Sequence, residues 1–282
     1  GALGKKKAKG GGESNTGAPG GKKVTMALKG TGPAAGAVTC VTISACGNYG
    51  FLGSASGWVD KYNIQSGTHR GGFQAHAVGT AVTALACDII NSACVSTGLD
   101  GTLRWSDFDS FKKIEAVGGE GDQASSPDDL FNVRVGSPVS GATLHRDSAL
   151  LAVLCDDLAV RVYDFDTQNL VRVFRGHTAR CTDLAFSPDS RWLVTTSLDC
   201  SLRVWHVPSG RMLEWAVFSE SPATSVAFAP DGAFVATTHV DSLGIYLWAN
   251  RAHFQTVPPA GVPRRGVEMY LASGSALPGD EV

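Results

Sequence analysis

The chain has 282 residues, of which 43% are hydrophobic and 18% charged, and its formal net charge is −2. These values are typical of a globular protein with a sizeable core and exclude a strongly basic chain. The longest apolar run, residues 149–155, is far shorter than the roughly 20 residues that cross a bilayer, so we expect no membrane partner. Seven cysteines without a CxxC pair favour a reducing compartment and indicate neither disulfides nor a metal site.

Residues 1–36 are rich in glycine and lysine and carry a single acidic residue, Glu13. Such a segment cannot bury a core, so we expect a disordered arm. Clustered lysines on a flexible chain give salt-sensitive contacts to phosphates without base specificity, although the same run also suits a localisation signal or a solubilising loop. The candidate RNA or localisation contacts are Lys5, Lys6, Lys7 and Lys9.

Short β-type runs bounded by Gly, Asp, Asn and Ser follow from about residue 37 to residue 257, and no long stretch has a helical period. Five of these runs open with a similar pattern: AVTCVTI (37–43), AVTALAC (81–87), ATLHRDS (142–148), CTDLAF (181–186) and ATSVAF (223–228). In the third run of a unit, a turn residue is followed six positions later by an aromatic residue, as in Asp157 to Tyr163. The sequence therefore consists of repeated units of several β-strands.

The aromatic positions give the period of the repeat. The equivalent residues are Tyr62, Ser106, Tyr163, Trp205 and Trp248. Their spacing is close to the roughly 40 to 45 residues of a propeller blade, except where an acidic insertion, residues 118–129, lengthens one unit. Trp105 is one residue out of register and would point to the opposite face of its strand, so Ser106 is taken as the equivalent.

Each unit is expected to close with a fourth strand. The fourth strands are HRGGF (69–73), KKIEAV (112–117), LVRVF (170–174) and MLEWAV (212–217). Four strands per repeat predict an all-β propeller of about five recognisable blades, which form a partial ring. We therefore divide the chain into the arm, a propeller segment at 37–257 and a Pro- and Gly-rich tail at 258–282.

The fourth unit resembles the WD-repeat family most closely. It begins with Gly176-His177 and continues as AFSPDSRWLVTTSLDCSLRVWHV (185–207), with His206 where the family has a terminal Asp. Longer phrases (45–71, 143–164, 185–210 and 239–250) resemble the last blades of the tandem-propeller, U-three small nucleolar RNA-associated WD-repeat subunits of the small-subunit processome. This resemblance implies a nucleolar, non-enzymatic scaffold in ribosomal RNA processing. Its implied partners are other WD-repeat subunits, including the periodic tryptophan protein, pre-ribosomal RNA and small nucleolar RNA.

The stretch SLDCSLRVWHVPSG (197–210) places serine, aspartate and histidine close together, as in nucleophilic enzymes. The family resemblance instead implies a structural hydrogen-bond chain from Trp205 through Ser197 and His177 to Asp199. We favour the structural interpretation, because a nucleophile needs an exposed elbow or oxyanion donors that a strand does not offer. No catalytic residue, cofactor, metal site or small-molecule substrate is expected.

An alternative function remains open at the end of the last unit. Some WD-repeat proteins recruit cullin ubiquitin ligases through Trp-Asp-x-Arg, and Trp248 to Arg251 has the tryptophan and the arginine but lacks the aspartate. A ligase substrate receptor, or another WD-repeat scaffold, is therefore the alternative to the processome subunit.

Overall fold

The computed structural model describes residues 36–114, 133–218 and 221–250, and within these ranges the regular elements are β-strands. We call the successive sheets blades one to five. Blade one contains β1 (Val38–Ile43), β2 (Tyr49–Ser54), β3 (Trp58–Asn63) and β4 (His69–Gln74). Blade two contains β5 (Val82–Cys87), β6 (Ala93–Gly98), β7 (Thr102–Asp107) and β8 (Val133–Arg134).

The remaining blades follow in chain order. Blade three contains β9 (Val139–His145), β10 (Leu150–Cys155), β11 (Val160–Asp164) and β12 (Leu170–Phe174). Blade four contains β13 (Cys181–Phe186), β14 (Trp192–Ser197), β15 (Ser201–His206) and β16 (Arg211–Val217). Blade five has three strands among the described residues: β17 (Ala223–Phe228), β18 (Phe234–His239) and β19 (Ile245–Ala249).

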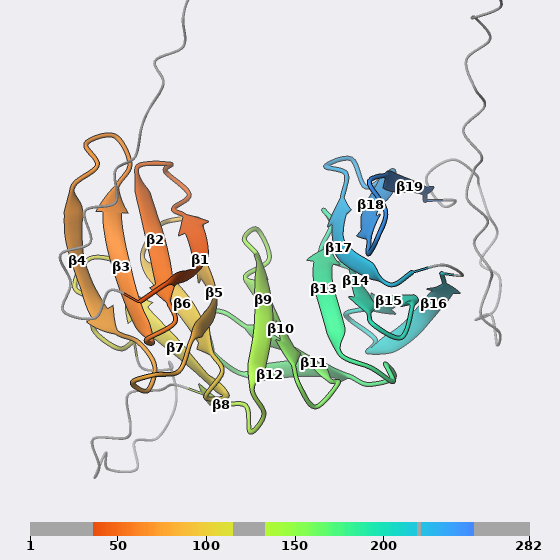
Figure 1. The fold of residues 1–282 in the computed structure, drawn as a ribbon, viewed down its shortest axis with the longest axis horizontal. Coiled ribbons are helices and arrows are strands. Elements are labelled where there is room, and N and C mark those ends of the chain that lie inside the picture. The colour runs from red at the N-terminus through yellow and green to blue at the C-terminus, as the bar shows by residue number, and fades with distance from the viewer. Residues whose placement is uncertain (1–35, 115–132, 219–220, 251–282) are drawn as a thin grey trace, which may run out of the picture.

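Each blade is an antiparallel meander whose strands pair in chain order. The first strands of consecutive blades pack against one another, β1 on β5, β5 on β9, β9 on β13 and β13 on β17. Figure 1 shows the resulting open arc, in which blade one and blade five lie at opposite ends. The all-β propeller architecture predicted from the repeat is confirmed, and so is the partial ring.

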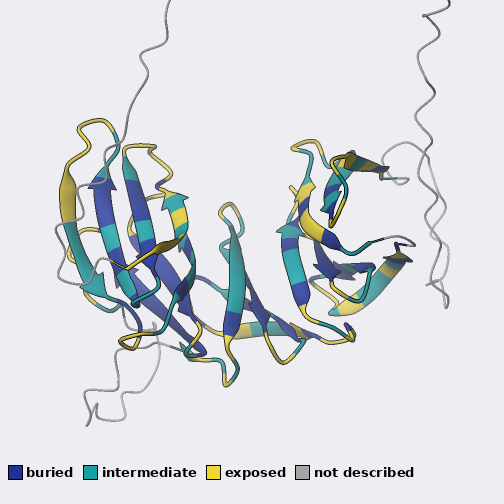
Figure 2. Ribbon diagram, viewed as in Figure 1, coloured by how far each residue is buried: buried dark blue, intermediate teal, exposed yellow. Residues whose placement is uncertain are grey.

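The hydrophobic core lies between neighbouring blades. Four clusters of buried side chains fill the four spaces between successive blades. In the cluster between blades three and four, for example, Phe174 of β12 stacks at 5.1 Å from Trp205 of β15. In Figure 2 dark blue is concentrated on inner strands such as β6, β10 and β14, while β1 and β19, in the blades at the two ends, carry exposed residues.

A β-bulge near the start of each first strand repeats in all five blades. The bulged residues all carry hydroxyl groups: Thr39, Thr83, Ser140, Thr182 and Thr224. Two of them reach the next blade, because Thr39 Oγ1 donates to Val82 O at 2.5 Å and Thr182 Oγ1 donates to Ala223 O at 2.7 Å. The bulge thus positions a side chain that bonds one blade to the next.

The strand registers confirm the assignment of the anchor position. Ser106 pairs with the second residue of β6, as Trp205 pairs with the second residue of β14. Trp105 projects from the other face of β7 and is buried in the cluster between blades two and three, 6.1 Å from the ring of Phe165. Blade two therefore has no tryptophan at the position where blades four and five have one.

The fourth strand of blade two differs from the prediction. Residues 115–117 of the predicted strand lie outside the described residues; Lys113 forms a bridge to Ser106, and the strand that pairs with β7 is β8, after the insertion. The sequence did not predict β8, which is the fourth strand among the described residues: Ile114 N bonds to Trp105 O, and Val133 pairs with Leu103. The arm (residues 1–35), the insertion at 118–129 and the tail lie outside the described residues.

Candidate functional site

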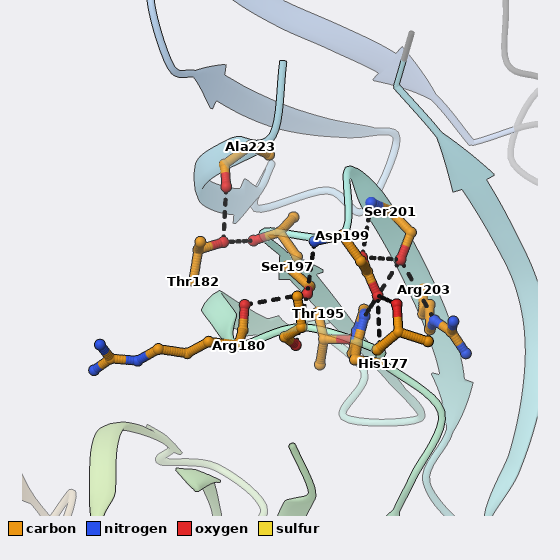
Figure 3. A network of polar contacts seen from close by, with 12 residues as sticks. His177, Arg180, Thr182, Thr195, Ser197, Asp199, Ser201, Arg203 and Ala223 are labelled. Atoms are coloured by element: carbon orange, nitrogen blue, oxygen red, sulfur yellow. Dashed lines mark hydrogen bonds and ion pairs between the residues drawn. The ribbon is translucent and has the colours of Figure 1, made fainter. Parts of the chain in front are cut away.

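The polar network of blade four connects three of the four residues singled out from the sequence, and Figure 3 shows His177 and Asp199 within it. Trp205 Nε1 donates to Thr195 Oγ1 at 2.9 Å, and Thr195 Oγ1 lies 2.7 Å from His177 Nε2. His177 Nδ1 then lies 3.1 Å from Asp199 Oδ2. The loop before β13, the strands β14 and β15, and the turn between those strands are therefore joined by one buried chain of hydrogen bonds.

Ser197 does not occupy the place in this chain that the sequence suggested. Its Oγ donates to the main-chain carbonyls of Ala179 and Arg180 at 2.9 and 3.1 Å, and it accepts a bond from Asp199 N at 3.2 Å. Thr195 supplies the hydroxyl between tryptophan and histidine instead. Thr195 and Ser197 project from the same face of β14. Thr195 is two residues from Leu193, which pairs with Trp205, and is therefore nearer to the tryptophan than Ser197 is.

The ionisation of the network follows from its contacts. Burial opposes ionisation of Asp199, but hydrogen bonds from Ser201, Thr178 N and His177 outweigh burial and lower the pKa of Asp199 to about 2. Burial lowers the pKa of His177, and Asp199 works in the opposite direction. A neutral imidazole that donates from Nδ1 to the carboxylate and accepts at Nε2 from Thr195 satisfies every bond in the chain.

Blade two contains a second network that the sequence interpretation missed. His76 Nδ1 lies 3.1 Å from Asp100 Oδ1, and His76 Nε2 lies 3.0 Å from Ser96 Oγ. Thr102 Oγ1 completes it with a 2.6 Å bond to Asp100 Oδ1. In the sequence, His76 and the turn residue Asp100 could have indicated this network. The pattern is harder to recognise because alanine, rather than glycine, precedes the histidine.

Blade five uses a shorter version of the chain. Trp248 Nε1 donates to Thr237 Oγ1 at 2.9 Å, and this hydroxyl lies 3.0 Å from His239 Nε2. Trp248 is buried, and Asn250 Nδ2 donates to Gly232 O at 3.2 Å. The first and third residues of the candidate ligase motif are thus held within the blade, and Arg251 lies outside the described residues.

The remaining features considered from the sequence are the lysines of the arm, metal binding and membrane spanning. Lys5, Lys6, Lys7 and Lys9 lie outside the described residues. Within the part of the chain that the structure describes, no group of three or more His, Cys, Asp or Glu residues is arranged to hold a metal ion. A search of the same part found no helix long and apolar enough to cross a membrane.

Meander sheets in an arc, cores between successive sheets and histidine-centred networks define a WD-repeat β-propeller segment. A family model described as the WDR36/Utp21 second beta-propeller domain matches residues 22–269. The chain belongs to this family.

Similar proteins agree with the family assignment. Human "WD repeat-containing protein 36" is 39% identical over 244 residues, which cover 86% of this chain and 25% of that protein. The "U3 small nucleolar RNA-associated protein 21 homolog" of Schizosaccharomyces pombe is 40% identical over 221 residues, or 78% of this chain and 23% of that protein. "Periodic tryptophan protein 2" of Arabidopsis thaliana is 29% identical over 170 residues, or 60% of this chain and 17% of that protein. The chain thus spans about a quarter, or less, of these relatives.

Proposed function

We propose that this chain is part of a non-catalytic scaffold subunit of the small-subunit processome, the U3 particle that matures the RNA of the small ribosomal subunit. The observation that carries the proposal is the family match over residues 22–269, with a relative whose name states association with U3 small nucleolar RNA. The geometry supports a scaffold, because the histidine, threonine and aspartate of blade four are committed to one another and to holding strands in place.

The proposal includes partners and a location. The partners are other WD-repeat subunits of the same particle, among them the periodic tryptophan protein, whose Arabidopsis member is itself similar to this chain. Pre-ribosomal RNA and small nucleolar RNA are the proposed nucleic-acid contacts, through Lys5, Lys6, Lys7 and Lys9, and the nucleolus is the proposed site of action. We also propose that the arm and the tail flank a propeller segment at 37–257.

Affinity purification of the tagged full-length protein tests this function. U3 small nucleolar RNA and the periodic tryptophan protein should both be enriched relative to a purification of an unrelated tagged propeller protein. Depletion of the protein should lower mature small-subunit ribosomal RNA while large-subunit RNA persists. Enrichment of a cullin ligase adaptor without U3 RNA would instead support the alternative, and enrichment of none of these would end the proposal.

A further inference from the structure

The turn between β15 and β16 differs in charge from the equivalent turns of blades two and three. In those blades the last residue of the third strand is Asp107 or Asp164. Each of these carboxylates accepts hydrogen bonds from two backbone N–H groups of its own turn, at 2.7 to 3.2 Å. In blade four the same register position, opposite the first residue of the second strand, is His206.

His206 performs the capping role without a carboxylate. Its Nδ1 accepts a bond from Ser209 N at 3.3 Å and lies 2.7 Å from Ser209 Oγ. Imidazole has two nitrogens, and the cap uses Nδ1. Within the described residues, Nε2 of His206 forms no hydrogen bond. The exchange of aspartate for histidine therefore keeps the turn closed and removes a negative charge from this corner of the blade.

Three arginines surround the same turn. Arg172 of β12 extends from blade three and donates from Nη2 to Pro208 O at 2.6 Å. Arg191 accepts a bond from Val207 N at its carbonyl oxygen, at 2.8 Å, and Arg211 is the cross-strand partner of His206. Arg191 and Arg211 are exposed. The corner thus gathers three permanent positive charges beside the histidine.

Burial opposes ionisation of one nearby carboxylate, Asp189, but its hydrogen bond from Ser187 and the charge of Arg191 help to lower the pKa of Asp189. Within the described ranges, none of the three guanidinium groups forms an ion pair. Asp189, on the same loop as Arg191, accepts bonds from Ser187 Oγ at 2.5 Å and from Arg191 N at 3.2 Å. Glu214, another acid of the same blade, is an exposed residue further along β16. Arg172 donates from both Nη atoms to main-chain carbonyls, of Val171 and Pro208, so it is the exposed Arg191 and Arg211 that keep guanidinium donors available to an anion.

An aromatic side chain completes the surface. Trp192 pairs directly with His206, which pairs directly with Arg211, so the three side chains project from one face of the sheet. Trp192 and His206 are both half-buried. Guanidinium groups recognise phosphates, and an aromatic ring beside them offers a stacking surface for a base. An acidic peptide would use only the first of these two features.

We propose that this surface, the His206 corner formed by Arg191, Trp192, His206 and Arg211, with Arg172 bonded to the turn from blade three, binds the sugar-phosphate backbone of single-stranded RNA without base specificity. The corner is separate from the lysine-rich arm. The proposal rests on side-chain geometry and charge and does not depend on membership of a particular particle, so direct binding can test it independently of the purification described above.

The test uses the purified full-length protein and a fluorescently labelled single-stranded oligouridine, with binding followed by anisotropy over a range of KCl concentrations. The Arg191→Glu/Arg211→Glu variant should bind about tenfold or more weakly, and its slope of log affinity against log salt should fall by roughly 1.4, about 0.7 for each lost phosphate contact. The matched control, Arg70→Glu/Arg134→Glu, changes two exposed arginines of blades one and two and should bind as the wild type does.

His206→Asp separates binding from folding. It restores the carboxylate found in blades two and three, so the turn stays capped and the thermal midpoint should not change, while RNA affinity should fall. Unchanged RNA affinity in the Arg191→Glu/Arg211→Glu variant, or an equal loss in the control pair, would overturn the proposal. So would tighter binding of a labelled polyglutamate peptide of matched charge, which would assign the corner to an acidic protein.

Discussion

The central link of the blade four network is the hydroxyl of Thr195, which accepts from Trp205 and donates to His177. Thr195 is fully buried, and its two partners are also buried. A group that satisfies two buried polar atoms at once has more effect on stability than an exposed hydroxyl, since its removal leaves both partners without a bond and out of reach of water.

We expect Thr195→Val, which keeps the shape of the side chain, to lower the free energy of unfolding by about 1 to 3 kcal/mol. Chemical denaturation of the full-length protein measures the loss. Thr238→Val is the matched control, since the Thr238 hydroxyl bonds only to the hydroxyl of Thr224 among the described residues, and it should cost less than about 0.5 kcal/mol. Equal losses in the two variants would contradict the role assigned to Thr195.

The carboxylate at the end of the network makes stability depend on pH. The folded-state pKa of Asp199 is lowered to about 2, below that of an unfolded aspartate, so the stabilisation is complete above about pH 4 and is lost as the pH falls towards 2. Wild type should therefore exceed Asp199→Asn in free energy of unfolding at pH 5, by on the order of 1 kcal/mol after solvent screening, and the difference should shrink towards pH 2. A difference that stays constant over this range would contradict the assignment.

Sequence reasoning at this scale found His177, Asp199 and Trp205 but chose the wrong hydroxyl. Alternation places residues 195 and 197 on the same face of β14, and only the cross-strand register shows which lies nearer to the tryptophan. His76 was missed for a different reason. The network of blade two lacks both the preceding glycine and the tryptophan, so little of the sequence pattern remained even though the histidine–aspartate geometry is preserved.

At the scale of strands, the repeat predicted most of the blade architecture. Turn residues and alternating apolar positions located the first three strands of each blade, with β9 beginning at Val139 rather than at residue 142, because second strands pair on both edges and first strands pack against those of neighbouring blades. The outer strand has one free edge and weaker constraints. The sequence of blade two could therefore not reveal that Val133 and Arg134 form the strand that pairs with β7.

The two ends of the arc carry faces that resemble blade interfaces. Ile245 and Leu247 of β19 occupy the register positions of Leu202 and Val204 of β15, which pack against blade five. Ile245 is 70% and Leu247 62% exposed, whereas Leu202 is 3% exposed. The bulged Thr224 bonds within its own blade, although its counterpart Thr182 reaches the next one. We infer that a further blade covers this face.

Aspartate at both exposed positions tests this inference. In the full-length protein, Ile245→Asp/Leu247→Asp should lower the free energy of unfolding by about 3 kcal/mol or more, because two charges would enter a buried interface. In the isolated 282-residue chain the same change should improve solubility, because it removes an exposed apolar patch. Leu170→Asp/Val173→Asp on the outer strand β12 is the control and should have little effect in either form. A full-length protein that tolerates aspartate at 245 and 247 would show that no blade covers this face.

The interrupted outer strand of blade two has a consequence for how this protein can change over evolution. Ile114, before residues 115–132, bonds to Trp105, and Val133, after them, pairs with Leu103, so β7 holds the two flanking residues close together whatever the number of residues between them. Each doubling of such a loop costs only about 0.6 kcal/mol in closure entropy. The rim of this blade can therefore acquire or lose sequence, and with it new binding specificity, while the packing between blades stays the same.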